Sequence, residues 1–539
     1  VLRATVARLG KQEAVAFPHL NLRWNWNEFD QRVDQAARGL VALGIRRGEH
    51  VAIWATNIPQ WIILQFATAR IGAVLVTVNP AYRVFELQHV LKQSDAVALF
   101  LLDRFKSSDY FQVATELLGG LTAGEGNRSI AAEYPLLRHV IALRGNPPPG
   151  MMTWSDALAG GQTIGDSQLQ RCCHGQRDTD AINIQYTSGT TGFPKAATLS
   201  HRNILLNAFH VGTCQRLTSA DRICIPVPFY HCFGCVLGTL TAVVHGATMI
   251  IPAEYFTARS VLAAIEKEKA TAVYGVPTMF VAELADPHFD QRDLSSLRTG
   301  IMAGSPCPEE IMRQVIERMG AEEITIAYGQ TEASPVITQT RTDDPINLRV
   351  ETVGKPLPGI EVRILGPTTR TECEVGQTGE ICCRGHGVML GYYKQPEATA
   401  AALDADGWLH TGDLGQQLAN GYYQITGRIR DVVIRGGENI YPREIEECLF
   451  QHPAVEQTAV VGVPDPRFGE ELCAWVKLKD GCSLTSDQLK SFCRYRIAHF
   501  KVPKYIKFVH AFPLTATGKI QKYKIRQQMR EELQQHDRS

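Results

Sequence analysis

Apolar residues follow two different spacings along most of the chain. An amphipathic helix is predicted where they recur every three or four positions, at Phe29, Val33, Ala36 and Leu40. Short unbroken apolar runs predict buried strands at 51–55, 74–78, 96–102, 181–184, 271–276 and 324–327. A second helix is predicted to open in its first turn at Pro308, with one apolar face formed by Ile311, Val315 and Met319. Strands that alternate with helices predict a layered α/β fold with parallel strands.

The chain is too long for a single hydrophobic core. A length of 539 residues predicts roughly two to four domains. Loops are predicted at 145–152 and 366–379. Beyond Arg428, a short apolar run, a Gly-Gly turn and a helix that opens at Pro442 predict a compact tail. We therefore expect a large α/β N-terminal domain over 1–428 and a small α+β C-terminal domain over 429–539.

Composition narrows the classes of function. Lys plus Arg and Asp plus Glu each number 55, and this balance argues against a broad nucleic-acid-binding surface. The most apolar stretch, 236–251, is short and contains His245, so no transmembrane segment is predicted. The sequence starts at Val1 without a signal-peptide core, so we expect a trimmed N-terminus whose targeting peptide is not visible. The 14 cysteines are interpreted as reduced thiols of a cytosolic or matrix-like compartment.

One segment carries most of the chemical information. Directly after the run 181–184 comes Tyr186-Thr-Ser-Gly-Thr-Thr-Gly-Phe-Pro-Lys195. Glycines and small hydroxyl residues let a backbone approach a polyphosphate closely, and Lys195 adds a positive charge. The segment does not satisfy the Walker A pattern. A loop of this composition alone would be a flexible turn, but the ordered ending in Pro-Lys favours phosphate binding.

This segment resembles the signature of the adenylate-forming superfamily, with Ala196 where that family usually has Gly. The resemblance covers most of the chain, because further segments match in order: 303–306, 328–332, 410–414, 427–428, 436–442 and 513–519. It implies the fold of that superfamily, with a mobile C-terminal domain that swivels near Arg430. A Gly-rich stretch at 385–391 lacks the spacing and the following helix of a dinucleotide fingerprint, and the resemblance makes it structural.

The resemblance implies roles for individual residues. ATP and the pantetheine arm of coenzyme A would contact Thr187, Ser188, Gly189, Thr190, Thr191, Gly192, Phe193, Pro194, Lys195, Gly304, Ser305, Pro306, Tyr328, Gly329, Asp413, Arg428, Gly436 and Gly437. Catalysis would use Thr331, Glu332, His231 and Lys519, with Glu332 also holding Mg²⁺. Each residue also has an ordinary reading on its own: Asp413 and Arg428 could form a surface ion pair, and Lys519 could be a solvated lysine.

The implied activity is ATP-dependent ligation of a fatty acid to coenzyme A through an acyl-AMP intermediate. Residue by residue, the matching segments most resemble those of mitochondrial medium-chain acyl-CoA synthetases, which implies a mitochondrial matrix location. Apolar segments at 228–234 and 274–278 would line the acyl pocket. An aryl-CoA ligase, a carrier-protein-loading enzyme and an inactive nucleotide-binding regulator remain as alternatives.

A basic run near the C-terminus allows three interpretations. Nine Lys or Arg and no acidic residue lie between 494 and 526. This run favours either attraction of anionic CoA or ATP, or an ordinary solvated face, with a weak peripheral membrane contact as a third interpretation. The sequence does not indicate an oligomeric state.

Overall fold

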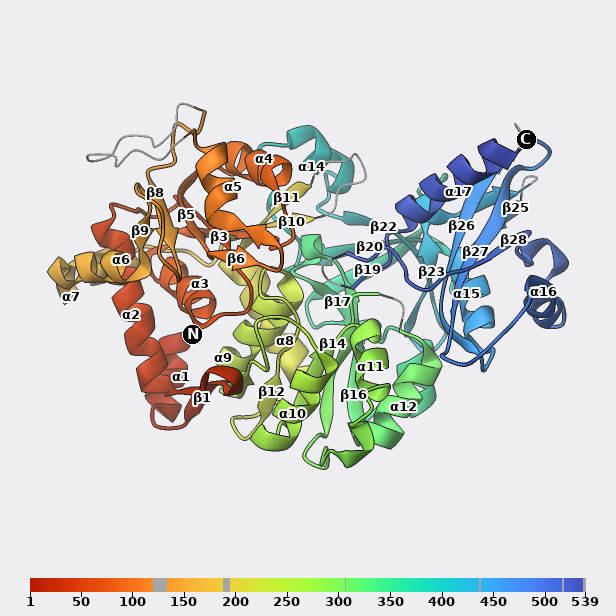
Figure 1. The fold of residues 1–539 in the computed structure, drawn as a ribbon, viewed down its shortest axis with the longest axis horizontal. Coiled ribbons are helices and arrows are strands. Elements are labelled where there is room, and N and C mark those ends of the chain that lie inside the picture. The colour runs from red at the N-terminus through yellow and green to blue at the C-terminus, as the bar shows by residue number, and fades with distance from the viewer. Residues whose placement is uncertain (120–132, 188–193, 306, 436–437, 516–517, 537–539) are drawn as a thin grey trace.

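The computed structural model describes residues 1–119, 133–187, 194–305, 307–435, 438–515 and 518–536. Among the described residues, three sheets of four or more strands and one two-stranded sheet build the large N-terminal part. A further sheet builds the C-terminal part, which lies at one end of the molecule (Figure 1). The fold is therefore mixed α/β with a large N-terminal and a smaller C-terminal domain, as predicted. The exact boundary at 428/429 stays a prediction.

The first large sheet has the strand order β21-β11-β10-β4-β3-β5-β8-β9. Its strands are β21 (Gly391–Tyr392), β11 (Lys195–Ser200), β10 (Ala181–Thr187), β4 (Val74–Val78), β3 (His50–Trp54), β5 (Ala96–Leu101), β8 (His139–Ala142) and β9 (Met152–Thr153). The accompanying helices are α2 (Trp26–Ala42), α3 (Pro59–Ile71), α4 (Val84–Ser94), α5 (Tyr110–Leu117), α6 (Trp154–Gly160) and α7 (Asp166–Cys173), and a small hairpin joins β6 (Arg104–Phe105) to β7 (Ser108–Asp109).

The second large sheet has the order β18-β17-β16-β15-β14-β12-β13-β1-β2. Its strands are β18 (Lys355–Pro356), β17 (Val336–Gln339), β16 (Glu323–Gly329), β15 (Thr299–Ala303), β14 (Ala272–Gly275), β12 (Arg222–Cys224), β13 (Thr248–Ile250), β1 (Glu13–Phe17) and β2 (Leu22–Asn25). Its helices are α1 (Leu2–Leu9), α8 (His201–Cys214), the π-helix η3 (Phe233–Leu240), α9 (Thr241–His245), α10 (Ala258–Glu268), α11 (Pro277–Leu284), α12 (Glu309–Met319) and α13 (Ile346–Glu351).

The remaining sheets are smaller. An antiparallel sheet joins β19 (Ile360–Leu365), β20 (Gly379–Gly385), β22 (Leu409–Gln417) and β23 (Tyr423–Arg428), and α14 (Pro396–Ala402) precedes β22. The C-terminal domain contains β24 (Val433–Arg435), β25 (Glu438–Ile440), β26 (Val455–Asp465), β27 (Gly469–Leu478), β28 (Tyr505–Phe508), α15 (Pro442–Phe450), α16 (Ser486–Arg494) and α17 (Lys522–His536). The short η6 (Ile429–Asp431) connects it to β23.

The hydrophobic pattern predicted these elements for identifiable physical reasons. Helix α2 begins at a capping box, in which the Asn25 side chain accepts from the Glu28 backbone and the Glu28 carboxylate accepts from the Asn25 backbone. All six apolar runs are strands, and the residues of β3, β4 and β5 are buried throughout. Two details differ. Pro308 is the N-cap before α12 and not part of its first turn. Both large sheets are mixed, because β11, β17, β18, β2 and β21 pair antiparallel at their margins.

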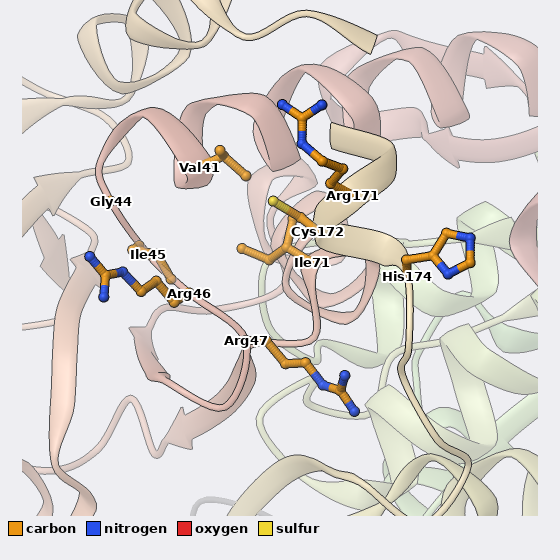
Figure 2. A pocket seen from close by; sticks show the side chains of 9 residues that line it. All are labelled: Val41, Gly44, Ile45, Arg46, Arg47, Ile71, Arg171, Cys172 and His174. Atoms are coloured by element: carbon orange, nitrogen blue, oxygen red, sulfur yellow. The ribbon is translucent and has the colours of Figure 1, made fainter. Parts of the chain in front are cut away.

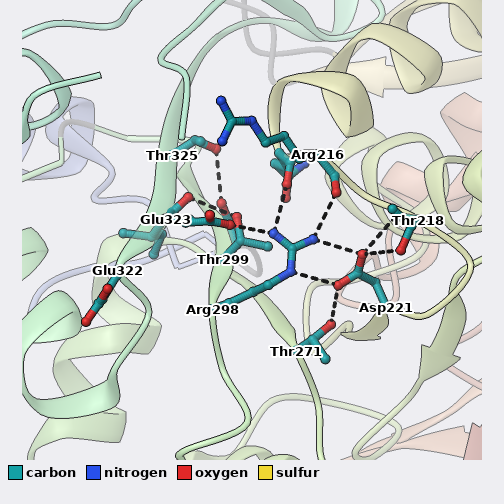
Figure 3. A network of polar contacts seen from close by, with 12 residues as sticks. Arg216, Thr218, Asp221, Thr271, Arg298, Thr299, Glu322, Glu323 and Thr325 are labelled. Carbon is teal, nitrogen blue, oxygen red and sulfur yellow. Dashed lines mark hydrogen bonds and ion pairs between the residues drawn. The ribbon is translucent and has the colours of Figure 1, made fainter. Parts of the chain in front are cut away.

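A charge network centred on the buried Asp221 holds the N-terminal ends of four parallel strands together (Figure 3). Arg298, just before β15, donates two hydrogen bonds to Asp221, at 3.0 and 2.8 Å, and one to Glu323 at 2.5 Å. Thr271, just before β14, donates to the same Asp221 carboxylate at 2.7 Å. Burial alone would raise the pKa of Asp221, but the hydrogen bonds and charge of Arg298 hold that pKa below its usual value. The network lies at the sheet edge opposite to the C-terminal strand ends.

Replacing Arg298 should destabilise the fold strongly. In Arg298→Ala the Asp221 carboxylate, whose side chain is 5% exposed, loses its counter-ion, and we expect a loss of about 3–5 kcal/mol in the free energy of unfolding. Urea denaturation measures this loss. Arg313→Ala, which breaks an exposed pair with Glu309 within α12, is the control and should cost less than about 1 kcal/mol. Equal losses in the two variants would contradict the assigned role of the network.

Candidate active site

The C-terminal ends of the parallel strands in the second large sheet collect several of the predicted residues. Strand β15 leads directly to Gly304 and Ser305, and β16 ends with Tyr328 and Gly329. Gly304 has a φ of +90°, a backbone conformation that side chains with a Cβ rarely adopt. This edge is where ligands bind in open α/β sheets.

The predicted phosphate loop is the connection of a β-hairpin. Strands β10 and β11 pair antiparallel, with Thr187 opposite Lys195 at the open end. Pro194 immediately precedes β11. The predicted contacts Ser188, Gly189, Thr190, Thr191, Gly192 and Phe193 lie outside the described residues, as do Pro306, Gly436 and Gly437. The hairpin therefore places both anchors of the loop, Thr187 and Lys195, beside each other.

Glu332 lies next to these anchors. It belongs to the short 3-10 helix η5 (Thr331–Ala333) and is 9% exposed. Its Oε1 accepts hydrogen bonds from the Tyr392 hydroxyl at 2.8 Å and from the Thr187 hydroxyl at 3.4 Å. The Lys195 ammonium lies over the Tyr392 ring, 4.9 Å from its centroid. Tyr392 thus contacts both Lys195 and Glu332.

The sequence analysis did not identify Tyr392 as a site residue. Tyr392 comes directly after the Gly-rich stretch 385–391, which the sequence analysis interpreted as structural. The signal is topological, because β21 is hydrogen-bonded to β11 and thereby brings Tyr392 beside the loop. No local pattern predicts this pairing between segments so distant in the chain.

A second group of polar residues surrounds Asp413. Asp413 on β22 and Arg428 on β23 are directly opposite each other, and the Arg428 Nε lies 2.7 Å from Asp413 Oδ1. The Tyr328 hydroxyl donates to Asp413 Oδ2 at 3.0 Å. The charge of Asp413 raises the pKa of Arg428, so the guanidinium stays charged. Three residues from separate motifs therefore form one hydrogen-bonded group.

The C-terminal domain contributes Lys519 to the same region. Gly518, the residue before it, accepts a hydrogen bond from the Thr278 hydroxyl of α11 at 3.5 Å. A Cβ added at Gly304 would lie 3.7 Å from the Lys519 Cε, so the lysine side chain passes the end of β15. Burial and the charge of Arg428 lower the pKa of Lys519. The structure thus brings Lys519 against the strand ends of the N-terminal domain.

His231 is partly buried beside these groups, in a neutral form. Its Nδ1 accepts from the Phe233 backbone N–H at 3.1 Å, which leaves the ring proton on Nε2. Burial, with a smaller contribution from the Lys519 charge, lowers the pKa of His231 to about 3. At neutral pH this imidazole can donate one hydrogen bond from Nε2 and carries no charge.

Two cysteines next to His231, Cys232 and Cys235, have the C-x-x-C spacing, which the sequence analysis overlooked. Cys232 lies 3.6 Å from the Thr331 hydroxyl, and Cys235 accepts from the Gln185 amide at 3.2 Å. Burial raises the pKa of Cys232 to about 11, and it also raises that of Cys235. Both are free thiols that stay protonated at neutral pH, so they pack as small apolar groups.

The π-helix η3 begins directly after Cys232 and depends on a glycine. A Cβ at Gly234 would lie 2.2 Å from the Pro228 carbonyl oxygen, far inside van der Waals contact. The Phe233 ring packs 6.1 Å from the Tyr274 ring of β14, so the helix start joins the two segments 228–234 and 274–278. At this junction the backbone of Gly234 lies so close to the Pro228 carbonyl that a side chain with a Cβ does not fit without a shift.

Gly234→Ala should therefore disturb the site through packing. The added methyl forces the backbone around His231 to shift, and we expect a loss of about 1–3 kcal/mol in stability. We also expect a raised KM for the carboxylic acid that the resemblance implies as substrate. Thermal unfolding and steady-state kinetics measure the two effects. Gly165→Ala, where no atom lies within 4 Å of the added Cβ, is the control. An unchanged KM for that acid in folded Gly234→Ala would refute the expected link between this helix and the acyl pocket that the resemblance implies.

A pocket of about 400 Å³ lies elsewhere, between the end of α2, the loop that follows it, α3 and α7 (Figure 2). Its lining combines apolar residues with positive side chains, namely Val41, Gly44, Ile45, Arg46, Arg47, Ile71, Arg171, Cys172 and His174. None of these residues belongs to the motifs described above. Arg47 is already paired with Asp180.

Comparisons with known proteins agree with this arrangement. Sequence profiles of the AMP-binding enzyme family and of the AMP-binding enzyme C-terminal domain match residues 2–393 and 444–519. YngI of Bacillus subtilis (strain 168), named provisionally as an acyl-CoA synthetase, is 52% identical over 98% of this chain and 97% of its own. The medium-chain acyl-CoA ligase ACSF2, mitochondrial, of Homo sapiens is 40% identical over 99% of this chain and 87% of its own.

Solved structures give the same result. The anthranilate CoA ligase AuaEII in complex with anthranoyl-AMP superposes with a TM-score of 0.86 at 27% identity, over 98% of this chain and 96% of its own. ATP-bound MatB from Rhodopseudomonas palustris superposes with a TM-score of 0.83 at 28% identity, over 98% of both chains. Profile, relatives and structures converge, and the chain belongs to the AMP-binding enzyme family.

Proposed function

We propose that this protein activates a fatty acid with ATP and transfers the acyl group to coenzyme A, as an AMP-forming acid–thiol ligase. The observation that carries the proposal is the convergence of Lys195, Glu332, Asp413 and Lys519 around one edge of the second large sheet. These residues come from four segments of the chain, and each is a type that binds phosphate, metal or ribose.

In the first step, a carboxylate oxygen of the acid attacks the α-phosphorus of ATP. A C–O–P linkage forms, the bond between the α-phosphorus and the bridging oxygen breaks, and pyrophosphate leaves with that oxygen. Negative charge builds on the phosphoryl oxygens, so the positive charges of Lys519 and Lys195 stabilise the transition state. The Nε2 proton of His231 is suited to orient the acid carboxylate. Asp413 would accept from the ribose hydroxyls.

Glu332 fits the requirements of Mg²⁺. Both of its hydrogen bonds use Oε1, and among the described residues none uses Oε2. Mg²⁺ prefers hard oxygen ligands and typically takes one or two carboxylates together with substrate phosphates. Bound there, Mg²⁺ would neutralise charge on the phosphates. Tyr392 and Thr187 would hold Glu332 in place for this contact.

In the second step, the thiol of coenzyme A attacks the acyl carbon and AMP leaves. We propose that residues 429–539 rotate for this step about the segment at Arg430 and withdraw Lys519. Asp431 accepts from Arg526 of α17 at 3.4 Å, so the connecting segment is tied to the small domain. Gly436 and Gly437 remain the proposed contacts of the pantetheine arm.

The names of the relatives support a medium-chain fatty acid as the substrate, since ACSF2 is named a medium-chain acyl-CoA ligase. Buried apolar residues around the junction, such as Phe233 and Val276, suit an alkyl chain. An aryl acid is the second candidate, because AuaEII is an anthranilate CoA ligase of nearly the same fold.

Fewer observations bear on the proposed matrix location and on the proposed peripheral membrane contact. Mitochondrial ACSF2 supports the location, whereas YngI is bacterial. Among the described residues, no helix is long and apolar enough to cross a membrane. In the basic run 494–526, acidic partners pair with Lys501, Lys504, Lys507, Lys522 and Arg526. This pairing favours a solvated face over a membrane contact.

Pyrophosphate release across a panel of acids tests the substrate class. The panel runs from acetate through octanoate to stearate, with benzoate, anthranilate and amino acids, each with and without coenzyme A. We expect release to peak at medium-chain acids, with acyl-CoA formed only when coenzyme A is present. A peak at the aryl acids would replace the fatty-acid proposal, and silence throughout in protein that binds ATP would favour a regulator.

A further inference from the structure

The antiparallel sheet β19-β20-β22-β23 carries a cluster of residues that the proposed reaction does not use. Glu380 and Cys382 lie on β20 and His410 on β22, with Cys382 directly opposite His410. One ligand atom from each, a carboxylate oxygen, a sulfur and a ring nitrogen, lies within 4.8 Å of the other two. Glu380 and Cys382 are buried, and the His410 side chain is 17% exposed.

The spacing of these atoms fits a tetrahedral metal centre. The His410 Nδ1 lies 3.3 Å from the Cys382 sulfur and 3.1 Å from Glu380 Oε2. Around Zn²⁺, with bonds of about 2.0–2.3 Å, neighbouring ligand atoms lie roughly 3.3–3.8 Å apart. The two measured separations lie at or just below the short end of this range, and the sulfur and the carboxylate oxygen lie within 4.8 Å of each other. We propose that Glu380, Cys382 and His410 bind a thiophilic divalent cation of the Zn²⁺ class.

The surroundings orient the ligands as a metal site requires. Asp404 lies 3.6 Å from the other ring nitrogen of His410, Nε2, where a carboxylate would fix the ring tautomer. The second oxygen of Glu380, Oε1, accepts from the Gly412 backbone N–H at 3.1 Å, which leaves Oε2 toward the cluster. A thiolate, an imidazole and a carboxylate together favour Zn²⁺ over Mg²⁺.

A side-chain cation already occupies this position. The Arg370 Nη1 donates to Glu380 Oε2 at 2.6 Å and to His410 Nδ1 at 2.9 Å. A guanidinium only donates, so in this contact Nδ1 would accept with its lone pair, which is the tautomer that metal binding requires; a proton on Nδ1 would instead be donated to Glu380 Oε2 at 3.1 Å. The Arg370 side chain is 58% exposed, and it can swing into solvent when a metal ion enters. Its removal should therefore tighten metal binding.

Cobalt titration of the full chain under reducing conditions, after chelator treatment, tests the site. We expect one Co²⁺ per chain with the visible bands of a tetrahedral ion and a thiolate charge-transfer band, and Zn²⁺ but not Mg²⁺ should abolish both. Cys382→Ser should remove the charge-transfer band, while Cys383→Ser, the adjacent buried cysteine whose side chain points to the other face of the strand, should keep it. An unchanged band in Cys382→Ser would overturn the proposal.

Two variants that keep all three ligands guard against a folding defect. Asp404→Asn should weaken the affinity for Co²⁺ by roughly 10- to 100-fold, as expected for loss of a carboxylate behind a metal-bound histidine. Arg370→Gln should strengthen it, because the competing cation is gone. Affinities equal to wild type in both variants, or no tetrahedral cobalt spectrum in wild-type protein, would also contradict the site.

Discussion

Lys519→Ala is expected to lose adenylation by about 10²- to 10³-fold in kcat while it retains most of the thioester-forming step from supplied acyl-AMP. The ammonium of Lys519 is the charge that the C-terminal domain brings to the ends of β14 and β15, where Thr278 and Gly304 lie. Its removal leaves the developing phosphoryl charge less stabilised. Thiol transfer takes place after the proposed rotation, in which Lys519 has left the site. Pyrophosphate release measures the first step, and consumption of synthetic acyl-AMP with coenzyme A measures the second.

Lys522→Ala is the matched control, because this neighbouring lysine pairs with Glu446 of the same domain. It should retain both steps. Equal loss of both steps in Lys519→Ala would contradict the division of labour between the two domain positions.

The lowered pKa of Lys519 also predicts the direction of a pH effect. The lysine is charged below its pKa and loses its charge as the pH rises through that pKa. Because the pKa of Lys519 is lowered, kcat/KM for adenylation should begin to fall at a lower pH than it would with a lysine of ordinary pKa. Lys519→Arg keeps a charge that does not titrate in this range. The alkaline fall should therefore move to higher pH in this variant, whatever its absolute rate.

Asp413→Asn is expected to raise the KM for ATP by roughly 100-fold, about 3 kcal/mol, with little change in the KM for the acid. Asp413 is 4% exposed, and both of its oxygens are already oriented, by Arg428 on one side and Tyr328 on the other. An amide can accept with only one of its two polar atoms, so it cannot accept from both ribose hydroxyls in the same geometry. Initial-rate kinetics at varied ATP measure the effect.

Tyr328→Phe gives a graded comparison. It removes one neutral donor to Asp413 and leaves the charge, so we expect a several-fold rise in the KM for ATP, about 1 kcal/mol. If Asp413→Asn raised the KM for the acid and left the KM for ATP unchanged, the assignment of Asp413 to the ribose subsite would be wrong.

Local patterns predicted the strands well because buried parallel strands are read directly from unbroken apolar runs. Strand β4 begins and ends at the predicted residues, β3 begins and ends one residue earlier than predicted, and β5 ends one residue earlier. The antiparallel margins of the sheets were missed, since hydrophobic periodicity does not encode which strand pairs with which. The mixed character of both large sheets follows from these marginal pairings.

The site shows the same limit at the level of side chains. The resemblance implied that Asp413, Arg428 and Lys519 belong to one site, and the fold brings these three residues close together. The Tyr392 contact with Glu332 was not predicted, because it depends on the pairing of β21 with β11. The cluster of Glu380, Cys382 and His410 was missed for a similar reason: its ligands meet only across the β20–β22 pair.

In the proposed mechanism the acid is activated as an acyl-adenylate before the thiol attacks it. A rapid-quench experiment with enzyme in excess over octanoate, with ATP and Mg²⁺ and without coenzyme A, detects that intermediate. We predict that octanoyl-AMP and pyrophosphate accumulate in equal amounts, and that added coenzyme A then converts the adenylate to octanoyl-CoA and AMP. Formation of ADP and inorganic phosphate, or of octanoyl-CoA without a preceding adenylate, would contradict it.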